Sequence, residues 1–280
     1  MKFTVEEPAT LEVFLRGRQV SRRLLTKLKA REGGILRNGE PIRSIDSVLR
    51  GDVITLNPCD ESLIVPNGDL SADVVFENDS VAVFNKPANM PVHPSHNHQE
   101  DTLGNLFAAL YPGTAFRPIN RLDRDTSGLC VVAMNAYSAC VLHNKVSKTY
   151  WAAVEGQACA FGTVDAPIAR QNESIILRQV SPGGKRAVTH YVSERYSGTH
   201  TLVRVRLETG RTHQIRVHFA HIGMPLAGDD LYGGSRDVIS RQALHCGTVR
   251  FPDPVTGTEI QLDIGVADDI LRIFETMPSG

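Results

Sequence analysis

The chain has 280 residues, of which 41% are hydrophobic and 22% are charged, and its formal net charge at pH 7 is −1. These values are typical of a folded globular protein with room for a small module beside a larger domain, and they exclude a chain that is basic throughout. The sequence has no run of 18 apolar residues, and Glu6 and Glu7 stand where a secretion signal would be apolar, so we expect neither a membrane span nor a signal peptide. Five cysteines without a CxxC pair favour a reducing compartment, the cytoplasm.

Residues 1–57 are predicted to form a small separate α/β module whose charge is unevenly distributed. Seven basic residues and no acidic residue lie between Arg16 and Arg31. Ser21 is suited to cap a helix that begins at Arg22, and leucines recur in that helix at the spacing of one buried face. The side chains expected on its solvated side are basic: Arg22, Arg23, Lys27 and Lys29.

A small sheet is predicted to follow this helix. The Asn38-Gly39 pair is a strong signal for a β-hairpin, and residues 49–57 read as a turn that leads into a strand. This helix-and-sheet pattern resembles the RNA-binding module named after small-subunit ribosomal protein four. The resemblance implies that the four basic helix residues bind RNA; the alternative is a solvated basic helix on a purely structural domain.

The rest of the chain reads as an α+β domain. Residues 58–73 contain two prolines, an Asn-Gly pair and four acidic residues, and are expected to be a linker. Within residues 74–280, strand-like runs occupy 74–78, 80–87, 128–134, 149–156, 187–196 and 200–210, and helical spacing occurs at 102–111 and 136–146. This order predicts a mixed, mainly antiparallel sheet with interspersed helices.

Charged residues concentrate at the entrance of one apolar strand. Arg121, Asp123, Arg124 and Asp125 lie within five positions and precede the apolar run that begins at Leu129. Charged groups beside a buried strand cost desolvation free energy unless they are paired or used in a site. Asp125 also suits the turn chemistry of Asp-Thr-Ser-Gly, where its carboxylate can accept backbone N–H bonds. The residue types alone therefore favour Asp123 over Asp125 only slightly.

Four stretches, in this order, resemble the signature motifs of RluA-type pseudouridine synthases: VAVFNKPANMPVHPS (81–95), NRLDRDTSGL (120–129), KTYWA (148–152) and TGRTHQIRVH with PLAGDDLYGG (209–234). The resemblance spans residues 74 to about 265 and implies the catalytic domain of that family over residues 74–280. It implies an isomerase that detaches the uracil of a uridine in RNA and rejoins it to the ribose through ring carbon 5. That reaction has no redox change, so no cofactor is expected.

The same resemblance implies three catalytic residues. Asp123 is the essential carboxylate, and Arg216 keeps it ionised and oriented by bidentate pairing. Tyr150 packs against the face of the uracil, and its hydroxyl could help to remove the proton from carbon 5. Whether Asp123 attacks the sugar, attacks the base or removes a sugar proton stays open. Four further residues are expected to bind the substrate: Arg121, Arg211, His213 and Gln214.

Two positions depart from the family pattern. Asn120 stands where many members have histidine, and Asn89 stands where glycine is common. Asparagine does not titrate near neutral pH, so we give Asn120 no catalytic role. It tolerates the left-handed backbone, so we expect the turn at Asn89 to form.

The sequence also bears on functions other than pseudouridine synthesis. No HExxH, zinc-type Cys/His spacing or GxxxxGK[ST] loop is present, so we expect neither a metal site nor a nucleotide triphosphatase. A non-catalytic RNA-binding protein would have little reason to keep Asp123, Tyr150 and Arg216 together. A nucleoside or glycoside hydrolase would need a second carboxylate near Asp123. The expected partner is structured RNA, ribosomal rather than transfer RNA by analogy with the N-terminal module, and the protein is expected to be a monomer.

Overall fold

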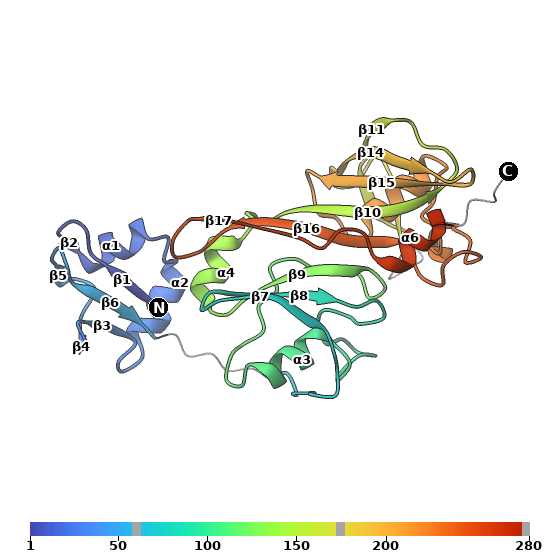
Figure 1. Ribbon diagram of the computed structural model, residues 1–280. Coiled ribbons are helices and arrows are strands. Elements are labelled where there is room, and N and C mark those ends of the chain that lie inside the picture. The colour runs from blue at the N-terminus through green and yellow to red at the C-terminus, as the bar shows by residue number, and fades with distance from the viewer. Residues whose placement is uncertain (58–62, 172–176, 276–280) are drawn as a thin grey trace.

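The computed structural model describes residues 1–57, 63–171 and 177–275, which form a small N-terminal part and a larger domain (Figure 1). The elements of the N-terminal part are β1 (Lys2–Thr4), β2 (Ala9–Thr10), α1 (Leu11–Gly17), α2 (Arg22–Lys29), β3 (Ile35–Arg37), β4 (Glu40–Pro41), β5 (Ser47–Val48) and β6 (Val53–Leu56). Strands β1, β6, β3 and β4 form a four-stranded sheet, and β2 pairs with β5.

Helix α2 begins and packs as the sequence predicts. The Ser21 hydroxyl accepts a hydrogen bond from the Leu24 backbone N–H at 3.2 Å and caps the helix, and the leucines at helical spacing are buried. The predicted hairpin is also present, because Asn38 and Gly39 join β3 to β4 with φ of 52° and 94°. Helix α1, which Thr10 caps, was not predicted.

The N-terminal part contacts the larger domain at helix α4 (Ala136–Leu142). The rings of Phe3 and Tyr137 meet edge to face, with centroids 5.2 Å apart. Lys145 Nζ donates a hydrogen bond to Gln19 Oε1 at 3.0 Å. These contacts bring the residues just before α2 to the end of the larger domain at which α4 lies (Figure 1).

Residues 58–73, the predicted linker, divide into two sections. Residues 58–62 lie outside the described residues. From Ile64 onward the chain packs on the larger domain, where Asn105 Nδ2 donates to the Val65 carbonyl at 2.7 Å and the Asn67 N–H donates to the Asn105 carbonyl at 3.0 Å. Ile64, Leu70 and Ala72 pack their apolar side chains on the main core, which explains why this section lies on the larger domain.

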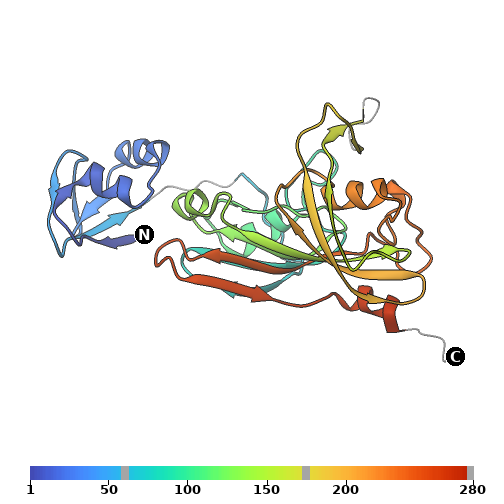
Figure 2. The same ribbon diagram turned by 90° about the horizontal axis from the view of Figure 1, so that it is seen from above.

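The larger domain is built on one sheet of nine strands. Its elements are β7 (Asp73–Glu77), β8 (Val81–Lys86), α3 (Leu103–Leu110), β9 (Ser127–Ala133), α4, β10 (Ser147–Glu155), β11 (Phe161–Asp165), β12 (Ile168–Arg170), β13 (Arg178–Val180), β14 (Val188–Tyr196), β15 (His200–Leu207), α5 (Gln214–His221), the 3-10 helix η1 (Asp230–Tyr232), β16 (Leu244–Pro252), β17 (Glu259–Asp263) and α6 (Asp268–Glu275). The strand order is β11-β14-β15-β10-β16-β9-β8-β7, with β17 on β16. Figure 2 shows the same sheet from above.

Strands β9 and β16 run parallel, whereas every other neighbouring pair described in this sheet is antiparallel. The predicted α+β class with a mixed, mainly antiparallel sheet is therefore confirmed. The two parallel strands approach closely at Gly128, where φ is 109° and a Cβ atom would collide with the carbonyl oxygen of Cys246. Glycine is needed there because it has no Cβ and adopts this backbone without strain.

Each strand-like run found in the sequence contains a strand of the sheet, and the predicted helix at 102–111 is α3. The helix predicted at 136–146 ends earlier, at Leu142, because His143 leaves the helix with ψ of 121° and Asn144 has φ of 60°. Strands β16 and β17 and helices α5 and α6 were not predicted. None of the described helices is long and apolar enough to cross a membrane.

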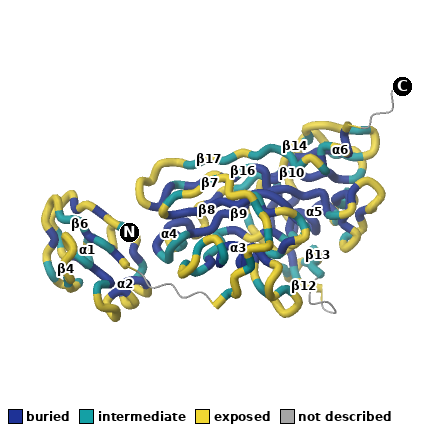
Figure 3. The backbone as a smooth tube through the Cα atoms, turned by 60° about the horizontal axis from the view of Figure 1, so that its bottom comes forward, coloured by how far each residue is buried: buried dark blue, intermediate teal, exposed yellow. Residues whose placement is uncertain are grey.

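The main hydrophobic core surrounds β8 and β9, which run through the buried centre of the domain (Figure 3). All seven residues of β9 are buried. Phe107 of α3 is fully buried and packs against Phe84 of β8, with ring centroids 6.3 Å apart. This packing fixes β9, the strand that directly follows the Asp123 motif.

Replacing Phe107 by alanine is expected to lower the free energy of unfolding of the larger domain by about 3–5 kcal/mol, because a cavity would remain between α3 and β8. Trp151 is the single tryptophan and lies in β10, so its fluorescence in a urea titration follows this domain. The matched control is Leu110→Ala on the same helix, where the side chain is 49% exposed and the cost should be about 0.5 kcal/mol or less. An unchanged urea midpoint for Phe107→Ala would contradict the prediction.

Candidate active site

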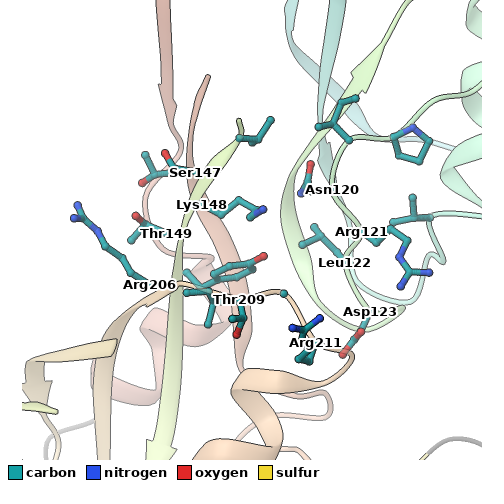
Figure 4. Close-up of a pocket in the computed structure, with 18 of the residues that line it drawn as sticks. Asn120, Arg121, Leu122, Asp123, Ser147, Lys148, Thr149, Arg206, Thr209 and Arg211 are labelled. Carbon is teal, nitrogen blue, oxygen red and sulfur yellow. The ribbon is translucent and has the colours of Figure 1, made fainter. Parts of the chain in front are cut away.

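A cleft of about 1450 Å³ contains Asp123 in its wall. Figure 4 shows the segment Asn120–Asp123 on one side of this cleft and the start of β10 on the other, with the Lys148 side chain directed toward the segment. The motifs that the sequence places far apart at 120–124, 147–151 and 207–213 therefore meet around one space.

The charged residues that line this cleft are mainly basic. Eight of its residues are arginine or lysine and three are acidic: Arg121, Arg124, Lys145, Lys148, Arg204, Arg206, Arg211 and Arg250 against Asp123, Glu208 and Asp263. Arg206 points to the opposite side of β10 from Asp123, so the cleft continues around this strand (Figure 4). A chain with a net charge of −1 thus concentrates positive charge here, as a polyanionic ligand requires.

The backbone on both sides of Asp123 is tied to neighbouring residues. Asn120 is buried, its Nδ2 donates to the Leu129 carbonyl at 3.0 Å, and its Oδ1 accepts from the Val131 N–H at 2.8 Å. After Asp123 the chain turns, and the Thr126 N–H donates to the Asp123 carbonyl at 3.1 Å. Asn120 therefore has a structural role, because it pairs the segment with strand β9.

The structure separates the two candidate aspartates. Asp123 lines the cleft, whereas Asp125 does not. The Asp125 carboxylate accepts hydrogen bonds from Arg124 Nε at 3.2 Å and Nη2 at 3.1 Å. Among the described residues, no backbone N–H donates to the Asp125 carboxylate, and its partner is the adjacent guanidinium instead.

Arg216 of α5 joins Asp123 to a second carboxylate. Its Nη1 donates to Asp123 Oδ2 at 3.1 Å, while its Nε and Nη2 each donate to Asp229, both at 2.7 Å. Burial lowers the pKa of the Arg216 guanidinium. The hydrogen bonds and charge of Asp229, followed by those of Asp123, raise this pKa by more than burial lowers it, so the side chain stays charged. The prediction that Arg216 forms a bidentate pair with Asp123 was wrong. The bidentate partner of Arg216 is Asp229, and Asp123 accepts one hydrogen bond from it.

Asp229 is the site residue that the sequence analysis missed. Its side chain is 1% exposed, and the turn that contains it is closed by the Asp229 N–H to the Leu226 carbonyl at 3.1 Å and the Gly234 N–H to the Asp229 carbonyl at 2.9 Å. The signal is the acidic pair in the PLAGDDLYGG motif, to which the sequence analysis assigned no site residue. Because Arg216 occupies both oxygens of Asp229, this carboxylate is not the free second acid that a hydrolase needs.

Tyr150 lies on β10, is 7% exposed and lines the cleft. Burial raises the pKa of its hydroxyl well above the usual value, and the nearby Cys246 and Asp123 raise it further. The phenol therefore stays protonated at neutral pH. The aromatic ring remains available to pack against a base.

Three predicted substrate-binding residues line the cleft: Arg121, Arg211 and His213. Arg121 and Arg211 are exposed, and Arg211 Nε donates to the Arg186 carbonyl at 3.0 Å. His213 Nε2 lies 3.8 Å from Asp123 Oδ2, and its Nδ1 lies 2.8 Å from the Tyr232 hydroxyl oxygen. His213 is therefore adjacent to the proposed catalytic carboxylate.

Gln214 is buried, and its amide is fully used inside the protein. The oxygen accepts from the Thr209 hydroxyl at 2.8 Å and the Arg211 N–H at 3.0 Å, and the nitrogen donates to the Val188 carbonyl at 3.0 Å and the Thr189 hydroxyl at 3.1 Å. The expected substrate contact through this amide is not supported. Gln214 instead holds the 209–213 loop against β14.

Two lysines of the motifs also contribute. Lys86 is fully buried, and its ammonium donates to the carbonyls of Pro87 at 2.6 Å, Met90 at 2.8 Å and Arg124 at 3.0 Å, while burial lowers its pKa to about 8. It thus ties the 87–90 turn, in which Asn89 adopts the expected φ of 60°, to the residue after Asp123. Lys148 lines the cleft and forms no ion pair with a described residue, and burial lowers the pKa of its ammonium group.

The four basic residues of α2 are exposed, and none of them lines this cleft: Arg22, Arg23, Lys27 and Lys29. They form a separate basic surface on the N-terminal part. Across the described residues, no group of three His, Cys, Asp or Glu side chains is placed to hold a metal ion.

Asp229→Asn is expected to lower the free energy of unfolding by about 3 kcal/mol or more, because a buried guanidinium would lose the anion that compensates it. The adjacent Asp230 offers a matched control, since its side chain is 60% exposed and pairs with Arg236 at the surface. Asp230→Asn should change stability by about 0.5 kcal/mol or less. Thermal or urea unfolding of both variants measures the difference, and equal stability of the two would refute the role of Asp229.

Comparison with known proteins places this geometry in a family. The family model described as RNA pseudouridylate synthase matches residues 80–221, half of the chain. The uncharacterized RNA pseudouridine synthase YjbO of Bacillus subtilis (strain 168) is 36% identical over 270 residues, which cover 91% of this chain and 95% of that protein. Ribosomal large subunit pseudouridine synthase D of Escherichia coli (strain K12) is 36% identical over 256 residues, covering 83% and 78%.

The fold is shared as well. The human RNA pseudouridylate synthase domain containing 1 superposes with a TM-score of 0.59 at 23% identity, over 78% of this chain and 98% of that one. The family expected from the four motifs is thus confirmed. The chain belongs to the RNA pseudouridylate synthase family, in its RluA branch, and is an isomerase that converts uridine to pseudouridine in RNA.

Proposed function

We propose that Asp123 is the essential carboxylate of this isomerase and that its substrate is ribosomal RNA of the large subunit. The observation that carries the proposal is the ion-pair chain in which Asp229 holds Arg216 and Arg216 holds Asp123 in the wall of a basic cleft. The proposed catalytic residues are Asp123 and Arg216, with Tyr150 beside them.

Isomerisation breaks the bond between the anomeric carbon and N1 of uracil and forms a bond from that carbon to C5, while a proton leaves C5 and N1 gains one. The reaction needs a fixed, ionised carboxylate beside the anomeric carbon. Arg216 binds Asp123 Oδ2, and no described residue donates a hydrogen bond to Oδ1, so this oxygen remains available to the ribose. Holding the carboxylate in place before the substrate arrives lowers the barrier because the group need not reorganise.

The detached uracil must be retained while it turns. Tyr150 provides an aromatic face for this purpose. Lys148 adds positive charge on the side opposite the Asn120–Asp123 segment (Figure 4). The target uridine must leave its base stack to reach Asp123, which favours a loop or bulge of structured RNA.

The N-terminal part supports a ribosomal substrate. It resembles the RNA-binding module of small-subunit ribosomal protein four, and the relative from Escherichia coli is named for the large ribosomal subunit. Gln19, two residues before the α2 cap, is bonded to Lys145, which lines the cleft. One folded RNA can therefore contact α2 and the cleft together. A monomer supplies every proposed site residue, and the cytoplasm is the proposed location because the proposed substrate is ribosomal RNA.

Asp123→Asn is expected to abolish pseudouridine formation and to leave RNA affinity within about twofold, because the change removes one charge and little contact area. Chemical mapping of pseudouridine in total RNA from cells that lack the gene identifies the target site, and complementation with each variant tests the residue. Asp125→Asn is the control and should restore the modification, since Asp125 does not line the cleft. Normal modification by Asp123→Asn would overturn the proposal.

Neutralising the basic face of α2 is expected to weaken RNA binding in a salt-dependent way. The fourfold variant replaces Arg22, Arg23, Lys27 and Lys29 by glutamine. Each lost phosphate contact should reduce the slope of log affinity against log salt by about 0.7–0.9. The control is Arg43→Gln in the same part of the chain, whose guanidinium is paired with Asp46. Unchanged affinity and slope in the fourfold variant would assign α2 a purely structural role.

A further inference from the structure

A hydrogen-bond chain leads to the edge of the Asp123 site and plays no part in the chemistry described so far. The Arg178 backbone N–H donates to the Tyr232 hydroxyl oxygen at 3.1 Å, and that oxygen lies 2.8 Å from His213 Nδ1. The other ring nitrogen of His213, Nε2, faces Asp123 Oδ2 at 3.8 Å. Tyr232 is itself held under Arg216, whose guanidinium carbon lies 5.0 Å from the ring centroid.

This arrangement selects one tautomer of His213. The Tyr232 oxygen already accepts a hydrogen bond from Arg178, and a phenol is a better donor than acceptor, so its single proton is directed to His213 Nδ1. A nitrogen that accepts a hydrogen bond carries no proton in the neutral ring, so the ring proton lies on Nε2.

The same surroundings keep the ring neutral. The His213 side chain is 12% exposed. Burial lowers its pKa, Asp123 raises it, and Arg216 and Arg178 lower it, with Asp229 raising it to a smaller extent. The net effect is a lowered pKa, so at neutral pH His213 carries one proton and no charge.

A donor at His213 Nε2 and an acceptor at Asp123 Oδ2 thus face the same space. Their separation of 3.8 Å is too long for a direct hydrogen bond. Oδ2 accepts one hydrogen bond from Arg216 and keeps a second lone pair, so it can accept another from a group in the cleft. An oxygen that bonds both must accept from one and donate to the other. Among the ribose and uracil oxygens of the target uridine, only a hydroxyl does this; the ribose ring oxygen and the uracil carbonyls can accept but not donate. The ribose hydroxyl next to the anomeric carbon is the 2′-hydroxyl, which distinguishes RNA from DNA.

We infer that His213 Nε2–H and the Asp123 carboxylate together bind the 2′-hydroxyl of the target uridine, and that Tyr232 is a positioning residue that keeps the proton on Nε2. The inference rests on the proposed role of Asp123. In this inference His213 recognises the ribose. Tyr232 does not contact the ribose and affects its recognition only through the position of the His213 proton.

The tautomer can be measured directly. Full-length protein labelled with ¹⁵N-histidine is examined by long-range ¹H–¹⁵N NMR at neutral pH, and the His213 signals are identified by their absence from His213→Gln. The expected spectrum shows Nε2 protonated and Nδ1 unprotonated, with a mixture of tautomers in Tyr232→Phe. A proton on Nδ1 of the wild-type ring would overturn the inference, whether or not the protein modifies any RNA.

Amide substitutions test which ring nitrogen matters. The glutamine amide nitrogen reaches the position of Nε2, whereas the asparagine nitrogen reaches that of Nδ1. His213 has a left-handed backbone with φ of 56°, which asparagine adopts more readily than glutamine. Backbone preference alone therefore predicts that His213→Asn is the more active variant. The inference predicts the reverse, with His213→Gln roughly three- to tenfold more active; higher activity of His213→Asn would contradict it.

The substrate group can be tested with matched RNAs. Affinities are compared for the target RNA with uridine or 2′-deoxyuridine at the site found by mapping. Tyr232→Phe should reduce the wild-type preference for ribose by roughly three- to tenfold. Tyr111→Phe removes another phenolic hydrogen bond, to Glu77 at 2.8 Å, and should leave the preference unchanged. An unchanged preference in Tyr232→Phe would exclude this role, whereas a wild-type enzyme inactive on every RNA would instead overturn the proposed function.

Discussion

The site depends on one buried guanidinium that is shared between two carboxylates. Arg216 is 7% exposed, and a charge in such a place is costly unless its donors are matched by anions with good geometry. Asp229 supplies that match with two hydrogen bonds and is itself 1% exposed. Because the charge of Arg216 is already compensated, Asp123 needs to accept only one hydrogen bond from it. The other Asp123 oxygen and the cleft beside it are left for the substrate.

A second set of polar groups keeps this geometry in place without touching the cleft chemistry. Asn120 bonds to β9, Lys86 bonds to the carbonyls around the Asp123 turn, and Gln214 bonds the 209–213 loop to β14. Each lies in a motif that reads as functional, yet each uses its hydrogen bonds to tie loop backbone to the scaffold. Such supporting residues explain why the sequence motifs contain more residues than those that would contact the substrate.

We propose that RNA recognition is divided between two basic surfaces in a chain of almost neutral overall charge. One is the lining of the cleft, and the other is the exposed face of α2. The contacts of Phe3 with Tyr137 and of Gln19 with Lys145 keep the N-terminal part at the end of the domain where the cleft rim lies. Charge distribution rather than net charge therefore decides the affinity for a polyanion.

The sequence by itself determined what depends on local pattern. The cap at Ser21, the Asn38-Gly39 turn, the strand runs and the choice of Asp123 and Arg216 as proposed site residues all follow from neighbouring residues or from ordered motifs. Only the tertiary structure decided which groups meet: that Asp229 rather than Asp123 receives the bidentate pair of Arg216, that the Gln214 amide is occupied, and that the Tyr232 hydroxyl lies beside His213 Nδ1. One hydrogen-bond chain joins Arg178, His213 and Tyr232, which lie far apart in the sequence. These residues come together only because helices and turns pack on a nine-stranded sheet. The pKa values of site residues also depend on the tertiary structure. The burial that raises the pKa of Tyr150, for example, exists only once the chain is folded.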